Sequence, residues 1–123
     1  METIYERLGD ENLRLLVDTF YDKVLQDDRI KDLFQTDIAL VKSKQFMFLS
    51  QFFGGPQRYS EQYGHPKLRM RHLPHKVTMD GAGAWLECMA HAISELPIEQ
   101  SFKEEIFMRF PHAARHMVNT ESI

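Results

Sequence analysis

The sequence predicts an all-α fold in one domain spanning residues 1–123, and three observations lead to that prediction. Apolar residues recur with the period of a helix, and no convincing stretch shows the strict alternation of a strand. Proline and glycine separate several of these periodic segments. The length of 123 residues, with 43% hydrophobic and 27% charged residues, suits a single globular domain.

Two helices, a helical turn and a third helix are expected in the first half of the chain. A short helix begins at Thr3, its N-cap, and ends near Leu8, because Gly9 favours a helix end. The apolar face of the next helix consists of Leu13, Leu16, Val17, Phe20, Tyr21 and Val24. A helical turn follows at 30–34. Asp37 then caps a helix whose inner face carries Val41, Gln45, Phe48, Leu49 and Phe52.

Proline and glycine delimit the expected helices of the second half. The turn Gly54-Gly55-Pro56 ends the third helix, and 57–65 is predicted as loop plus a helical turn. Pro66 starts a short helix that Pro74 must end. Thr78 or Asp80 caps a helix with Trp85, Met89, Ala92, Ile93 and Leu96 on one face. After Pro97 a last helix, kinked or broken by Pro111, carries Phe102, Ile106, Phe110, Ala113, Ala114 and Met117.

Charge and cysteine content exclude several classes of function. The formal net charge of −3 gives no general electrostatic reason to bind nucleic acid or an anionic membrane. The single cysteine, Cys88, rules out an internal disulfide and favours the cytoplasm. The first residues do not resemble a signal peptide, and no window approaches the ~18 apolar residues of a membrane span. Without a disulfide, so small a chain depends on a packed core, a cofactor or assembly.

Three polar side chains lie on helix faces that are otherwise apolar. Tyr21, Gln45 and Trp85 bring a hydroxyl, an amide and an indole N–H to the predicted inner faces. Burying such groups without partners costs about 1–3 kcal/mol each, so each needs a reason to be there. Either they converge as donors on a small ligand that accepts hydrogen bonds, or each is a core residue satisfied by a nearby carbonyl.

His72 lies on the predicted helix after Pro66, four residues after Leu68. A neutral imidazole on a rigid helix facing an apolar interior suits an iron ligand. The neighbouring cations, Lys67, Arg69 and Arg71, suit carboxylates at the edge of a cofactor. The alternative is a partly buried core histidine on a basic surface turn.

The remaining candidates point to ordinary surface or core positions. His112 and His116 are spaced for one face of a zinc site, but no third ligand matches, so a solvated pair is expected. His75 is separated from His72 by Pro74, which breaks the helix between them. Cys88 is predicted to be an inert thiol, and His91 a solvated side chain.

Several short motifs follow one another along the chain: LVDTFY (16–21), QFMFL (45–49), GGP (54–56) with Tyr59, YGHP (63–66), LRMRH (68–72), WLECM (85–89) and ARHMVN (114–119). Together they resemble the truncated haemoglobins of group II. They span essentially the whole chain. The resemblance implies a truncated globin, a two-over-two helical sandwich around one haem b. Trp85 points away from group I, whose members usually lack it.

The resemblance also implies a role for each site residue. His72 matches the proximal ligand of the iron, and Tyr21, Gln45 and Trp85 match the polar trio of the distal pocket. The other positions that match haem contacts are Phe34, Val41, Lys44 and Tyr59, with Lys44 pairing with a propionate and Arg71 as a second propionate partner. The chain departs from the family pattern at Val41, at His75 and in Gly81-Ala82-Gly83.

Three functions are weighed from these residues. The first is tight, reversible binding of O₂, with the distal donors slowing its release; CO, NO, peroxide and sulfide are further candidate ligands. The second is a redox enzyme on the same scaffold, a nitric oxide dioxygenase or peroxidase-like protein, which needs a separate electron donor because no flavin motif is present. The third is a helical interaction module without cofactor, in which the four polar residues are ordinary core.

Overall fold

The computed structural model describes residues 2–34, 37–64 and 79–111, and within them every regular element is helical. The elements are α1 (Ile4–Val24), η1 (Lys31–Phe34), α2 (Ile38–Phe52), α3 (Arg58–Tyr63), α5 (Met79–Ser94) and α6 (Gln100–Phe107). The all-α prediction is confirmed. The helix expected after Pro66 lies outside the described residues.

The predicted N-caps set the starts of the first two long helices. At α1, the Thr3 hydroxyl accepts from the backbone N–H of Glu6 (3.1 Å), and the Glu6 carboxylate accepts from the N–H of Thr3 (3.2 Å). Gly9 then interrupts the helix with φ 82° and ψ 158°, so a short helix and a long one meet there as expected. At α2, the Asp37 carboxylate accepts from the N–H groups of Ala39 and Leu40.

Two boundaries in the second half test the remaining cap and proline predictions. Met79 and Asp80 both lie within helix α5, so the alternative of Asp80 as its N-cap is wrong, and the other alternative, Thr78, lies outside the described residues. Asp80 lies instead in the first turn, where a carboxylate is stabilised by the positive end of the helix dipole. Helix α6 ends at Phe107, which agrees with the break expected from Pro111, because the proline ring clashes with the carbonyl four residues earlier.

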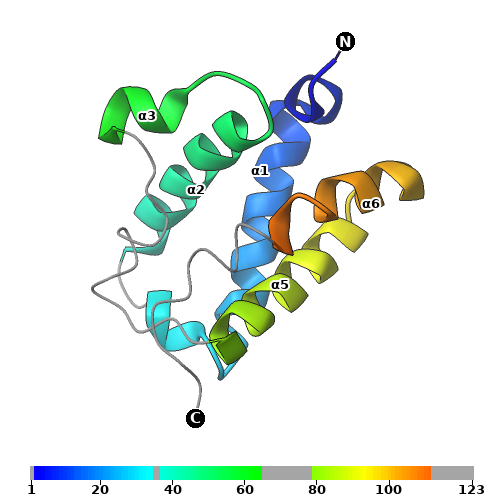
Figure 1. The fold of residues 1–123 in the computed structure, drawn as a ribbon. Coiled ribbons are helices and arrows are strands. Elements are labelled where there is room, and N and C mark those ends of the chain that lie inside the picture. The colour runs from blue at the N-terminus through cyan, green and yellow to red at the C-terminus, as the bar shows by residue number, and fades with distance from the viewer. Residues whose placement is uncertain (1, 35–36, 65–78, 112–123) are drawn as a thin grey trace.

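Each helix packs against the next in the order α3, α2, α1, α5 and α6 (Figure 1). Helix α1 packs against α2 and α5, α5 packs against α6, and α3 packs against α2. The core is richest along α1, where Leu13, Leu16, Phe20 and Val24 are fully buried. In the part of the chain that the structure describes, no helix combines the length and the apolar character needed to cross a membrane.

Candidate functional site

Tyr21 is the most buried of the predicted donors. It lies on α1 with only 2% of its surface exposed, and its ring meets Phe20 edge-on at 4.9 Å between centroids. Burial raises the pKa of the phenol well above its ordinary value, because the charged form is poorly solvated there. The hydroxyl therefore stays protonated at every physiological pH, the form that donates a hydrogen bond.

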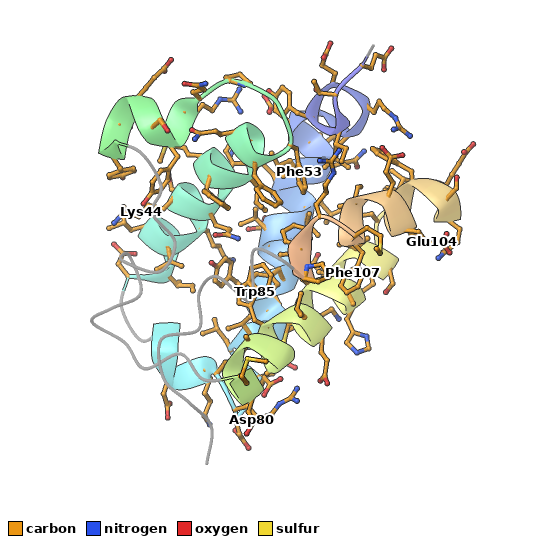
Figure 2. The ribbon with its side chains drawn as sticks, viewed as in Figure 1. Lys44, Phe53, Asp80, Trp85, Glu104 and Phe107 are labelled. Atoms are coloured by element: carbon orange, nitrogen blue, oxygen red, sulfur yellow. The ribbon has the colours of Figure 1, made fainter. Side chains whose placement is uncertain are left out.

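Trp85 reaches the same ring from a different helix. Its indole lies 5.1 Å from Phe20 and 5.6 Å from Phe110, and it is half-buried on the side of α5 that faces α1 (Figure 2). Phe20 thus makes edge-on contacts with the rings of both Tyr21 and Trp85. The fold brings two of the three predicted donors into one neighbourhood.

Gln45, the third predicted donor, lies on α2 and is half-buried. Among the described residues, none hydrogen-bonds to its side-chain amide. Its convergence with the other two donors stays a prediction.

The inner side of α2 carries a surface of half-buried aromatic rings. Phe48 and Phe52 stack with centroids 5.5 Å apart, the ring of Tyr59 lies 6.0 Å from Phe48, and Phe52 lies 5.4 Å from Phe110. Val41 lies half-buried on the same helix. These side chains pack against the core without being enclosed by it, which leaves apolar faces for a large flat group.

Lys44 marks one edge of this surface (Figure 2). Its ammonium lies 5.0 Å from the ring centroid of Tyr63, the last residue of α3. An ammonium placed beside this ring can also pair with a carboxylate. Tyr63 stands in the sequence only as part of the YGHP motif, and no spacing pattern predicts its contact with Lys44.

The other predicted site residues lie outside the described part of the chain. These are His72, Arg71 and the side chain of Phe34, together with Lys67, Arg69, His75, His112 and His116.

Two predictions of inert residues are confirmed. The Cys88 thiol is 5% exposed and donates to the Asp27 carboxylate at 3.7 Å. Burial, with the negative charge of Asp27, raises the pKa of this thiol to about 11, so the reactive thiolate is scarce near neutral pH. His91 is exposed, and no group of metal-binding side chains occurs among the described residues.

Packed helices whose inner faces bear aromatic rings and a buried phenol agree with the globin class. Comparison with known proteins makes the assignment specific. The model of the bacterial-like globin family matches residues 3–119. The chain therefore belongs to that family, as a truncated haemoglobin of group II.

Individual relatives agree along nearly the whole chain. A group 2 truncated haemoglobin of Bacillus subtilis, YjbI, is 45% identical over 115 residues, which are 94% of this chain and 87% of the relative. The crystal structure of the group II truncated haemoglobin from Bacillus anthracis superposes with a TM-score of 0.94, at 39% identity, over 100% of this chain and 95% of that one. A truncated oxygen-avid haemoglobin from Bacillus subtilis has a TM-score of 0.90 at 44% identity, over 96% and 100% of the chains. The two-over-two globin fold is confirmed.

The globin family implies a haem cofactor, and the described residues fit one. The half-buried rings of Phe48 and Phe52 offer apolar faces to a porphyrin. Lys44 offers a cation to a carboxylate at the porphyrin edge. The buried hydroxyl of Tyr21 offers a neutral donor.

Proposed function

We propose that this chain binds O₂ reversibly at the iron of one haem b, in a single globin domain. His72 holds the iron, and Tyr21, Gln45 and Trp85 donate hydrogen bonds on the opposite side. The observation that carries the proposal is the placement of a phenol and an indole from two helices around one buried ring, Phe20, at 4.9 and 5.1 Å. The similarity to a relative described as oxygen-avid, at 44% identity, supports O₂ as the ligand.

A bound haem supplies a ferrous iron with one coordination position open to a diatomic ligand. The residues of this chain act on the ligand by donating hydrogen bonds where partial negative charge collects. Tyr21 donates strongly because its surroundings exclude water, which would compete for the hydroxyl. Each such bond contributes about 1–1.5 kcal/mol, which slows ligand release about five- to tenfold.

Further residues hold the porphyrin itself. Val41, Tyr59 and Phe34 contact its faces, and Lys44 and Arg71 pair with its propionates. These roles are supported by the half-buried positions of Val41, Lys44 and Tyr59 beside the aromatic surface of α2. The single cysteine, free in the structure, supports a reducing setting such as the cytoplasm.

The test combines absorption spectroscopy with ligand kinetics. Purified protein supplemented with haemin should give a Soret band and a pyridine haemochrome of haem b at one haem per chain, and His72→Ala should change the ferrous spectrum and weaken haem retention. O₂ dissociation should be about five- to tenfold faster in Tyr21→Phe and in Trp85→Phe. A chain that takes up no haem, or dissociation that neither substitution changes, would contradict the proposal.

A further inference from the structure

The short helix α3 lacks the buried side chains that hold α1, α2, α5 and α6 in place. None of its six residues, Arg58–Tyr63, is buried. It lies beside the end of α2 (Figure 1) and packs against that helix. Because so little apolar area is enclosed, hydrophobic burial contributes little to its position, and its polar contacts must decide where it lies.

Arg58, the first residue of α3, joins it to two other helices. One guanidinium nitrogen donates to Asp10 Oδ1 (3.1 Å) and to Ser50 Oγ (2.9 Å), and the other donates to Tyr5 Oη (3.1 Å) and Asp10 Oδ2 (3.4 Å). The hydroxyl of Tyr5 in turn donates to Asp10 at 2.7 Å. One side chain of α3 is therefore bound to α1 through Tyr5 and Asp10, and to α2 through Ser50.

The contacts around Arg58 have little freedom to rearrange. Ser50 is fully buried, and its hydroxyl donates to the carbonyl of Phe46 (2.8 Å) while it accepts from Arg58. Two more hydrogen bonds join Gln51 of α2 to Ser60 of α3, at 2.8 and 3.0 Å. A Cβ at Gly55, in the turn that leads to α3, would lie 2.4 Å from the ring of Tyr5, so the chain passes closely over that ring.

The other contacts of α3 belong to the proposed haem site. The ring of Tyr59 meets Phe48 of α2, the ring of Tyr63 lies 5.1 Å from Tyr59, and the ammonium of Lys44 lies over Tyr63. A small displacement of α3 would therefore move an aromatic pair and the cation beside it.

We propose that Arg58 is a positioning residue for the haem site. Together with Tyr5, Asp10 and Ser50 it fixes α3, so that Tyr59 and Tyr63 keep their places at the edge of the aromatic surface of α2. The inference rests on the proposed haem function, and it assigns to Arg58 a role that acts through α3, by its contacts with Tyr5, Asp10 and Ser50.

Arg7 provides a matched control for a substitution of Arg58. It also pairs with a carboxylate, both oxygens of Glu105 lying 2.9 Å from one nitrogen. Each guanidinium also lies over an aromatic ring, that of Arg7 over Phe102 at 4.1 Å and that of Arg58 over Phe46 at 5.3 Å. The exposure of the two pairs is similar, 37% and 46% for Arg7–Glu105 against 31% and 48% for Arg58–Asp10. Arg7 joins α1 to α6, away from α3.

The experiment compares Arg58→Met and Arg7→Met with the unsubstituted protein, all loaded with haem. Transfer of haem to an excess of an acceptor globin should be about tenfold faster in Arg58→Met and changed less than twofold in Arg7→Met. Arg58→Lys, which keeps the charge but not the forked geometry, should fall between the unsubstituted protein and Arg58→Met.

A second measurement needs no haem. In the haem-free proteins, hydrogen exchange of amides 58–64 should be faster in Arg58→Met than in Arg7→Met, while amides in the middle of α1 stay protected in both. Equal haem loss in the two methionine variants, or unchanged exchange in α3, overturns the inference alone. Failure of the unsubstituted protein to take up haem overturns the proposed function, and the role of Arg58 at a haem site falls with it.

Discussion

Helices α1 and α2 carry inner faces that look alike in sequence and differ in the structure. On α1 the predicted apolar residues are all buried, from Leu13 at 0% to Val17 at 3% exposed. On α2 only Leu49 of the predicted face is buried, while Val41, Gln45, Phe48 and Phe52 stay half-buried. The same periodicity therefore produces a closed face on one helix and a partly open one on the other.

The packing partners of the two helices explain this difference. Helix α1 lies between α2 and α5, so protein side chains cover its inner face. Among the described residues, α2 packs against α1 and the short α3, and Val41, Gln45, Phe48 and Phe52 on its inner face stay half-buried. Large half-buried rings on an inner face are costly to leave in water, and a flat apolar cofactor against them recovers that free energy. The α1 face thus serves mainly the folded chain, with Tyr21 as its proposed donor to the ligand, and the α2 face serves the proposed cofactor.

The largest expected effect comes from removing the buried ring of α1 that contacts two of the predicted donors. Phe20 is fully buried and contacts both Tyr21 and Trp85. Phe20→Ala should lower the free energy of unfolding of the haem-free protein by about 3–5 kcal/mol, because it leaves a cavity in a closed core. Urea denaturation followed by circular dichroism measures this loss. A loss under 1 kcal/mol would mean that the α1 face is not the structural core.

Removal of the corresponding ring on α2 should lower the stability of the haem-free protein less and should speed haem loss. Phe48 is half-buried and stacks on Phe52. Phe48→Ala should cost the haem-free protein only about 1–2 kcal/mol, because less apolar area is lost from the core. Its haem loss to an acceptor globin should nevertheless be faster than that of the unsubstituted protein. The comparison fails if Phe48→Ala destabilises the haem-free protein as much as Phe20→Ala does.

The sequence was informative where local chemistry decides the structure, and much less so where distant contacts do. The caps Thr3 and Asp37 and the break at Gly9 were predictable because each depends on backbone chemistry within a few residues. The periodicity of α2 showed which residues share a face, but not how much of that face other helices cover. The contacts of Arg58 with Tyr5 and Asp10 join residues about fifty positions apart, and no spacing rule connects them.

A substitution of Gln45 tests whether the inner face of α2 is ordinary core or part of a ligand site. Gln45→Leu places an apolar side chain on this face in place of an amide to which no described residue hydrogen-bonds. The haem-free protein should therefore be unchanged or more stable by up to about 1 kcal/mol. O₂ dissociation from the haem-bound protein should become about fivefold faster, because a donor is lost. Stopped-flow measurements of O₂ release, beside urea denaturation, check both; slower or unchanged release would remove Gln45 from the distal donors.

The smallest expected effect concerns Asp27, which lies shortly after the last residue of α1. The Arg29 side chain and backbone N–H donate to Asp27 and hold the pKa of that carboxyl at about 2, below its ordinary 3.8. Arg29 also pairs with Glu87 of α5 at 2.7 Å, so the end of α1 is bound to α5.

Since the folded state favours the carboxylate of Asp27, the contribution of this carboxylate to stability is complete above its ordinary pKa and is lost as the pH falls toward 2. Asp27→Asn should flatten the decrease in stability between pH 4 and pH 2 without changing haem loss at neutral pH, as thermal denaturation at a series of pH values will show. A change in haem retention at neutral pH would mean that the closed face of α1 and the open face of α2 are not independent.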